Sequence, residues 1–198
     1  IGFAELLRDT RIDEETQKDY LDSIAYSGNA LLQLINDVLD LSKLEAGQMQ
    51  IMPEPTDFEA LGREVLKVFA HRAQQNKVEL DIRMPTMPVF DLDKLRVRQI
   101  LFNLVGNAVK FTSEGQVTLW AEFCPAEDED GDGCLRFAVS DTGPGIAEAD
   151  RTRLMEPFVQ LSGMRGTNAG NQGSGLGLSI AKRLAERMNG EMWLESEV

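Results

Sequence analysis

A regular apolar seam between residues 14 and 46 is the strongest constraint that the sequence places on its fold. Apolar or small residues recur there at alternating spacings of three and four, the repeat of a helix that buries one stripe along its length. These residues are Leu21, Ile24, Gly28, Leu31, Ile35 and Val38. Ala25, Leu32 and Leu39 widen the stripe to a width more typical of a helical bundle than of a two-stranded coil. The pattern predicts one long amphipathic helix that ends at Gly47.

The seam requires a partner, because a stripe of exposed Leu and Ile side chains on a lone helix is unstable in water. Residues 1–8 have the pattern of the end of a preceding helix, which predicts a helical hairpin within residues 1–50. Two hairpins can pack as a four-helix bundle, so we expect a homodimer through residues 14–46. Pro53 and Pro55 indicate a connector to the rest of the chain.

Composition narrows the possible partners. The chain has 33 acidic and 20 basic residues and a formal net charge of −13, which argues against nucleic acid, since a phosphate backbone requires a basic face. No apolar run approaches the roughly 18–20 residues that span a bilayer, and no signal peptide is visible. Cys124 and Cys134 flank an acidic stretch and could face each other across a hairpin, although reduced, packed thiols are the favoured interpretation.

From Thr56 onward the pattern mixes helices and strands. It predicts a helix near residues 57–75 and a strand near 78–83, followed later by two alternating strands. The inward residues of those two strands are Val117, Leu119 and Ala121, and then Leu135, Phe137 and Val139. The acidic loop between them matches the opening of an EF-hand, but a valine stands at the twelfth position, where calcium requires a bidentate glutamate. We therefore expect a hairpin turn.

Two asparagines four residues apart, Asn103 and Asn107, interrupt an otherwise apolar helix. Residues i and i+4 lie one above the other, so both carboxamides and the ammonium of Lys110, one turn further on, can point into one site. Carboxamide oxygens are suitable ligands for Mg²⁺, and lysine suits the phosphates that the metal neutralises. Taken alone, the two asparagines could equally well be ordinary helix-capping or surface residues with no ligand.

Two glycine-rich segments downstream favour a ligand site over a capping or surface role for the asparagines. The first, Asp141-Thr-Gly143-Pro-Gly145-Ile146, follows the second strand, where an aspartate can accept a hydrogen bond from an exocyclic amine. The second, Gly173-Ser-Gly175-Leu-Gly177-Leu-Ser179, opens an apolar helix whose N–H groups offer a phosphate site. It is not a Walker loop, because no Lys-Ser/Thr pair follows the glycines. Between them, residues 162–172 have the composition of a mobile lid or of a loop without function.

The order of these motifs resembles the catalytic part of the sensor histidine kinases of two-component systems. The asparagine box, Asp-x-Gly-x-Gly, Glu156-Pro-Phe158-Val-Gln160 and Gly-x-Gly-Leu-Gly-Leu-Ser occur in that family's order and at similar spacing. Residues 14–47, with their Asp-Leu-Ser-Lys-Leu-Glu-Ala-Gly end, resemble the second helix of its dimerisation domain. The resemblance implies an α+β chain, with part of a four-helix-bundle dimerisation segment in residues 1–50 and an α/β sandwich of Bergerat ATPase type in residues 51–198.

The resemblance also implies roles for individual residues. Asn107 would bind Mg²⁺, with Asn103 beside it as a second ligand or a polariser of the reacting group. Lys110 would contact phosphate, and Phe111 would line the nucleotide pocket. Asp141 would accept a hydrogen bond from the adenine amino group.

The glycine-rich segments would enclose the nucleotide. Gly143 and Gly145 would let the base lie against the backbone, next to Ile146. Arg165 would be a further contact from the lid, and Phe158 would anchor the lid by packing. The residues that border the triphosphate would be Gly173, Ser174, Gly175, Leu176, Gly177 and Leu178.

By the same resemblance the chain would be the cytoplasmic kinase core of a two-component sensor. It would bind Mg-ATP and donate the γ-phosphate to a histidine on the dimerisation helix, for relay to an aspartate of a response-regulator receiver domain. Whether the parent protein is anchored in the inner membrane stays open.

Two departures from the family pattern matter. The family's acceptor histidine lies on the first dimerisation helix, just before the segment where this chain begins, and the only histidine, His71, falls within the helix predicted for residues 57–75. We therefore expect a fragment without the acceptor, which binds ATP but does not phosphorylate itself. Residues 190–198 resemble the family's penultimate strand, so we expect the last strand to be missing and one sheet edge to be open.

Two other functions compete with this hypothesis. ATPases of the chaperone, topoisomerase and mismatch-repair type place a glutamate where Asn103 stands, to activate water, so the asparagine and the helical hairpin favour a kinase. The second competing function is a non-enzymatic dimerisation module whose pocket no longer binds nucleotide. The intact motifs argue against that function.

Overall fold

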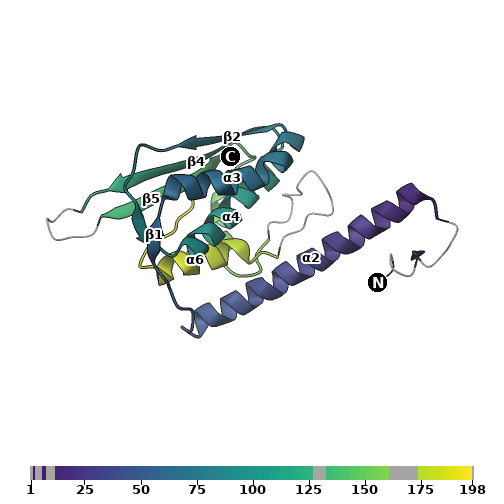
Figure 1. Ribbon diagram of the computed structural model, residues 1–198, viewed down its shortest axis with the longest axis horizontal. Helices are drawn as coiled ribbons and strands as arrows, with labels where there is room; N and C mark the ends of the chain where they lie inside the picture. The colour runs from purple at the N-terminus through teal and green to yellow at the C-terminus, as the bar shows by residue number, and fades with distance from the viewer. Residues whose placement is uncertain (1, 3–5, 8–11, 127–132, 161–173, 198) are drawn as a thin grey trace.

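The structure, a computed structural model, describes residues 2, 6–7, 12–126, 133–160 and 174–197. Helix α2 projects from an α/β part that contains the strands and the other long helices (Figure 1). The elements are α2 (Glu14–Glu45), β1 (Glu54–Thr56), α3 (Phe58–Gln75), β2 (Val78–Arg83), β3 (Phe90–Leu92), α4 (Lys94–Phe111), β4 (Gly115–Cys124), β5 (Cys134–Asp141), α5 (Glu148–Arg151), a 3₁₀ turn (Arg153–Met155) and α6 (Gly177–Arg187).

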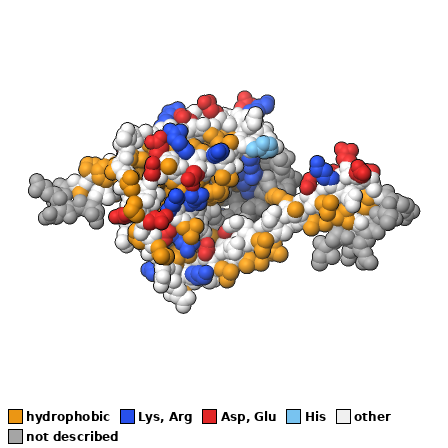
Figure 2. All heavy atoms as spheres, viewed as in Figure 1, with side chains coloured by type: hydrophobic (Ala, Val, Ile, Leu, Met, Phe, Trp, Pro, Cys, Tyr) orange, Lys and Arg blue, Asp and Glu red, His pale blue; other side chains and the backbone are white. Residues whose placement is uncertain are grey.

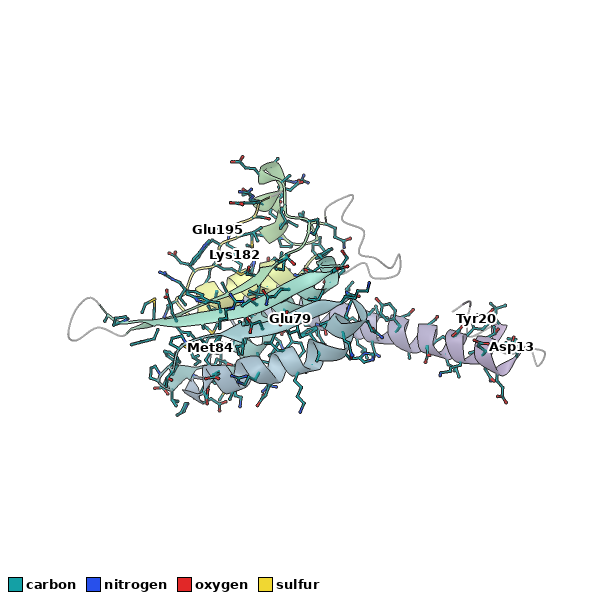
Figure 3. The ribbon with its side chains drawn as sticks, turned by 90° about the horizontal axis from the view of Figure 1, so that it is seen from above. Asp13, Tyr20, Glu79, Met84, Lys182 and Glu195 are labelled. Carbon is teal, nitrogen blue, oxygen red and sulfur yellow. The ribbon has the colours of Figure 1, made fainter. Side chains whose placement is uncertain are left out.

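The long helix predicted from the seam is confirmed to within one residue, as α2. Its start is capped by Asp13, whose carboxylate accepts hydrogen bonds from the backbone N–H of Thr16 at 2.9 Å and from its hydroxyl at 2.8 Å. Seen from above, Asp13 and Tyr20 mark the end of α2 that lies far from the sheet (Figure 3). After the helix the chain turns at Gly47, where a φ of +66° favours glycine.

The α/β part contains a mixed sheet of three strands. Strand β2 pairs with β4 in parallel and β4 pairs with β5 in antiparallel orientation, so the order is β2-β4-β5. Leu119 in β4 stands opposite Ile82 and Val139. This mixed sheet, with helices packed against it, confirms the expected α/β sandwich.

The core lies between this sheet and helices α3 and α4. Its main side chains are Phe58, Leu61 and Val65 from α3, Leu101, Val105 and Val109 from α4, and Val117, Leu119 and Ala121 from β4. The three β4 residues are fully buried, as their alternation predicted. Gly62 lets α3 approach closely, because a Cβ there would lie 2.7 Å from the Leu119 side chain.

A second apolar cluster joins the C-terminal end of α2 to α4 and α6. Its buried members are Leu41, Leu44, Met49, Ile100, Leu176, Ile180, Ala181 and Leu184. Polar contacts surround it: Gln99 donates to Asp40 at 2.7 Å, and Arg183 pairs with Glu45 at 3.0 Å. The end of α2 is thus fixed against the α/β part, whereas its beginning projects away (Figure 1).

Two expectations about strands were wrong. Residues 53–55 do not form a simple connector, because β1 pairs antiparallel with β3 and places Pro55 opposite Asp91. A proline is tolerated there because a two-stranded ribbon leaves edge positions without a required N–H donor. Residues 190–197 form no strand: the nearby Ile146 N–H donates to the Ser196 hydroxyl at 2.8 Å, a side-chain contact that cannot build a ladder.

Other expectations fall on residues that the structure does not describe. They concern most of the helix expected before residue 9 and the acidic loop at 127–132. Cys124 and Cys134 are Cα partners across the β4–β5 hairpin, and both are free thiols. Within the described ranges, no helix combines the length and the apolar character that a membrane span requires.

Candidate functional site

Helix α4 presents a polar face beside a buried apolar one. Its first turn is capped by Asp93, which accepts from the backbone N–H of Arg96 at 3.0 Å. Asn103, Asn107 and Lys110 are half-buried, as expected for residues that line a site rather than a core. In the described part of the chain, neither asparagine side chain has a hydrogen-bond partner, so both carboxamides are available to a ligand.

The second glycine segment meets this face of α4. Gly177 is the first residue of α6, and a Cβ on it would lie only 3.0 Å from the Asn103 side-chain oxygen. The structure therefore brings the asparagine box and the N-terminus of α6 together, as predicted. Any larger residue at 177 would displace the Asn103 carboxamide.

The segments immediately before and after the undescribed residues 161–173 are connected by a backbone hydrogen bond. The Phe158 N–H donates to the Gly175 carbonyl at 3.0 Å, and Gly175 has a φ of +73°. A Cβ at Gly175 would lie 2.9 Å from the Phe158 carbonyl carbon. The Phe158 side chain is 63% exposed, and the lid that it was expected to anchor lies outside the described residues. The Phe158 backbone, held at a φ of +64°, makes the contact with Gly175.

Ser174 connects the same segment to α2. Its hydroxyl donates to Asp37 at 3.0 Å and accepts from the Leu176 N–H at 3.2 Å. Asp37 is only 7% exposed and also accepts from the Gln33 amide at 2.7 Å. Sequence reasoning missed this contact, although an aspartate in a helical stripe with Leu41 and Leu44 was a signal that could have found it.

Asp141 ends β5, next to the last residues of α4. Its carboxylate accepts from the Gly143 N–H at 2.8 Å and is otherwise exposed. A Cβ at Gly143 would lie 2.6 Å from that carboxylate and 3.5 Å from the Phe111 carbonyl, so the two motifs adjoin. Gly145 follows with a φ of +75°, which favours glycine. The carboxylate is thus oriented by its own loop and open to a donor.

The Lys110 ammonium lies 4.9 Å from the Phe111 ring centroid. Partial burial lowers its pKa below the ordinary value, and the guanidinium of Arg72 on α3 lowers it further. No carboxylate among the described residues pairs with Lys110. An unpaired, partly desolvated ammonium is suited to bind an anion.

The remaining predicted site residues lie within or just after the undescribed segment 161–173. Arg165 and Gly173 lie outside the described residues. Leu176 is fully buried in the cluster with Ile180, so only its backbone can face a ligand, whereas Leu178 is half-buried. Within the described ranges, no three His, Cys, Asp or Glu side chains form a group that could hold a metal ion. A metal here would therefore need the carboxamides and a ligand's own oxygens.

Comparison with known proteins gives two family matches. The family described as histidine kinase-, DNA gyrase B-, and HSP90-like ATPase matches residues 92–198. The His Kinase A (phospho-acceptor) domain matches residues 1–47. The second match conflicts with the expectation of a fragment without the acceptor histidine, although residues 1–47 contain no histidine and His71 lies exposed on α3.

Individual relatives agree with these matches. The virulence sensor protein BvgS of Bordetella bronchiseptica is 42% identical over 99% of this chain and 16% of its own length. The autoinducer 2 sensor kinase/phosphatase LuxQ of Vibrio harveyi is 38% identical over 99% of this chain and 23% of its own. Full-length ShkA, crystallised in complex with AMPPNP, has 36% identity and a TM-score of 0.72 over 98% of this chain and 40% of its own.

This chain thus spans a quarter or less of those two sensor proteins. The ATPase match covers α4, the sheet strands β4 and β5, and α6, and so includes both motifs that the structure brings together. The chain belongs to the histidine kinase-, DNA gyrase B- and HSP90-like ATPase family and, within it, to the histidine kinases.

Proposed function

We propose that this chain is the ATP-dependent kinase core of a two-component sensor. Residues 1–50 would be part of the dimerisation and phosphotransfer segment, and residues 51–198 the ATP-binding catalytic domain. The observation that carries the proposal is the contact of Gly177, at the N-terminus of α6, with Asn103 on the polar face of α4. The AMPPNP bound by the relative ShkA supports a nucleotide as the ligand.

The polar face of α4 suits a nucleotide-bound Mg²⁺. Asn107, with Asn103 beside it, offers carboxamide oxygens that no described residue occupies. When bound, Mg²⁺ neutralises phosphate charge as the γ-phosphoryl group transfers. Lys110 adds a partly buried ammonium one turn further along the same face.

The N-terminus of α6 would hold the phosphate chain. Its first N–H groups are not used within the helix and carry the positive end of the helix dipole. Gly175 and Gly177 keep side chains away from them, while Ser174 and Leu178 flank them. Phosphoryl transfer depends mainly on positioning and charge neutralisation, which these groups can provide.

The base would lie at the other end of the site. Asp141, oriented by the Gly143 N–H, would accept a hydrogen bond from the adenine amino group. Phe111, Gly145 and Ile146 would border the ring. Guanine carries a carbonyl where adenine carries its amino group, so this carboxylate selects ATP over GTP.

An Asp141→Ala variant tests the base site. It should lose on the order of tenfold in ATP affinity, the usual loss for a hydrogen bond to a charged group, and should bind GTP as the unmodified chain does. Calorimetric titration measures both. Asp91→Ala, at an exposed aspartate of β3, is the control and should change neither affinity. Equal binding of ATP and GTP by the unmodified chain would contradict the role given to Asp141.

The proposed phosphate acceptor is a histidine on the dimerisation helix, for onward transfer to the aspartate of a response-regulator receiver domain. Because residues 1–47 contain no histidine, we propose that this polypeptide does not phosphorylate itself. With γ-labelled ATP and a separate polypeptide that carries the acceptor helix, acid-labile label should appear on that polypeptide. Acid-labile label on this chain that is lost in His71→Gln would contradict the proposal. A cytoplasmic location of this core, and an inner-membrane anchor on the parent protein, remain part of the proposal.

A further inference from the structure

Helices α3 and α4 pack closely beside the polar face of α4. The Phe69 ring lies 5.3 Å from the Phe102 ring, centroid to centroid, and would be 3.3 Å from a Cβ on Gly106. One turn from the end of the contact, the Asn76 side chain donates to the Val109 carbonyl at 3.0 Å. The last two turns of α3 therefore run beside the last two turns of α4.

Arg72 lies on α3 between these two contacts. It is three residues after Phe69 and four before Asn76, so it shares the side of α3 that faces α4. Its guanidinium is close enough to depress the pKa of Lys110. In Figure 2, blue basic side-chain atoms lie next to the pale blue histidine of the same helix. Two cations, from two helices, thus converge beside the asparagine box.

Among the described residues, every arginine except Arg72 has an oxygen partner. Arg96, Arg151 and Arg187 donate to a side-chain amide or a backbone carbonyl oxygen. Six arginines of the described chain pair with carboxylates: Arg63, Arg83, Arg98, Arg136, Arg153 and Arg183. In the same residues, neither Arg72 nor Lys110 has an acidic partner, although the sequence holds 33 acidic and 20 basic residues. Two like charges held together without a carboxylate repel each other, and an anion between them relieves that repulsion.

We propose that Arg72 is a second cation of the polyphosphate subsite and binds nucleotide phosphate together with Lys110. The inference rests on the proposed function, because it takes a nucleotide at the α4 face as the source of the anion. A guanidinium can donate two parallel hydrogen bonds to phosphate oxygens, whereas an ammonium acts as a point charge. Helix α3 then takes part in substrate binding and is not only a cover of the sheet.

Titration of matched variants with Mg-ATP and with adenosine tests this role. Arg72→Gln should weaken ATP binding on the order of tenfold and leave adenosine binding unchanged, because adenosine has no phosphate. Arg72→Lys keeps the charge and should recover part of the loss. Arg63→Gln removes an exposed arginine of the same helix, paired with Glu59, and should leave both affinities unchanged. The unfolding temperature of Arg72→Gln without nucleotide should not fall, since a like-charge repulsion is removed.

The outcomes separate the inference from the proposed function. If the unmodified chain binds ATP and Arg72→Gln binds it equally well, Arg72 is not a phosphate ligand and the proposed function stands. An equal loss for ATP and adenosine, or no recovery in Arg72→Lys, would also overturn the inference, because neither depends on a charge at the phosphates. If the unmodified chain binds neither ligand, the proposed function itself fails.

Discussion

Helix α2 carries two apolar stripes that differ in what covers them. One stripe, formed by Asp37, Leu41 and Leu44, faces the α/β part and is here called the docking stripe. Its leucines Leu41 and Leu44 are 8% and 9% exposed, because α4 and α6 pack against them. On the association stripe, which is the seam, Leu31 and Leu32 are 59% and 60% exposed. The residue type and the helix are the same, so the difference lies in the partner. Periodicity reveals an apolar face, but it does not reveal which surface covers that face.

The stripes also differ in their polar residues. The docking stripe includes Asp37, which is buried and bonded to Ser174, and is flanked by Asp40, which is bonded to Gln99. Such bonds fix one register between α2 and the α/β part. The association stripe has only apolar and small side chains near its centre, which suits burial against a second copy of the helix.

The largest effect should come from charging the association stripe. Leu31→Glu with Ile35→Glu should abolish self-association, because each Leu or Ile buried in a dimer contributes about 1.5–3 kcal/mol. The variant should remain folded and should still bind ATP, since the docking stripe is untouched. Sedimentation velocity and light scattering measure the mass in solution.

A matched control places the same charges elsewhere on α2. Asn29→Glu with Asn36→Glu alters exposed residues outside both stripes and should leave the mass of the assembly unchanged. If the unmodified chain is a monomer at high concentration, a stable dimer through residues 14–46 is ruled out for this polypeptide.

The docking stripe should respond to loss of volume rather than to charge. Leu44→Ala should lower the free energy of unfolding by roughly 2–3 kcal/mol, through lost burial and the space left between α2 and α6. Leu39→Ala, on the association stripe and 52% exposed, should change the unfolding of the monomer little. Urea unfolding of both variants in the monomeric Leu31→Glu, Ile35→Glu background makes the comparison. Equal losses would show that the two stripes do not differ as described.

The smallest effect should be at the start of the projecting part of α2. Hydrogen bonds from the Thr16 N–H and hydroxyl hold the pKa of Asp13 below its ordinary value of 3.8. The cap therefore contributes its full stability above the ordinary pKa and loses it as pH falls through the lower, folded value. Over that acidic range, the Thr16 and Gln17 amides should lose protection against hydrogen exchange, measured relative to their intrinsic exchange rates at each pH. Unchanged protection there, or the same pH response in Asp13→Ala, would contradict the role of the cap.

Much of the fold could be predicted from the sequence because long elements carry clear periods. Helices α2, α3 and α6 and strands β2, β4 and β5 all follow such patterns, and Gly47 and Asp57 mark boundaries where predicted. The three-residue strands β1 and β3 are too short for a period, and Pro55 argued against one. The strand expected at residues 190–198 rested on the family resemblance alone, and in the structure residues 190–197 have no pairing strand.

The candidate site also has features that the sequence could predict and features that it could not. The asparagine face of α4 and the helix-opening glycines indicate a site when their spacings are taken together, and the structure brings them together at Asn103 and Gly177. The Asp37–Ser174 bond could not be found, because it joins residues 137 positions apart. Arg72 could not be predicted as a site residue for a similar reason. Its position beside Lys110 depends on how α3 packs against α4, and one sequence alone does not predict that packing.

Titration with ATP in the presence and absence of Mg²⁺ tests the nucleotide site most directly. We predict that Mg²⁺ strengthens ATP binding to the unmodified chain on the order of tenfold, through the carboxamide of Asn107. Asn107→Ala should retain the metal-free affinity and lose this gain, while Asn29→Ala on the exposed side of α2 should behave as the unmodified chain. An equal gain from Mg²⁺ in Asn107→Ala, or no ATP binding by the unmodified chain, would contradict a magnesium nucleotide site on α4.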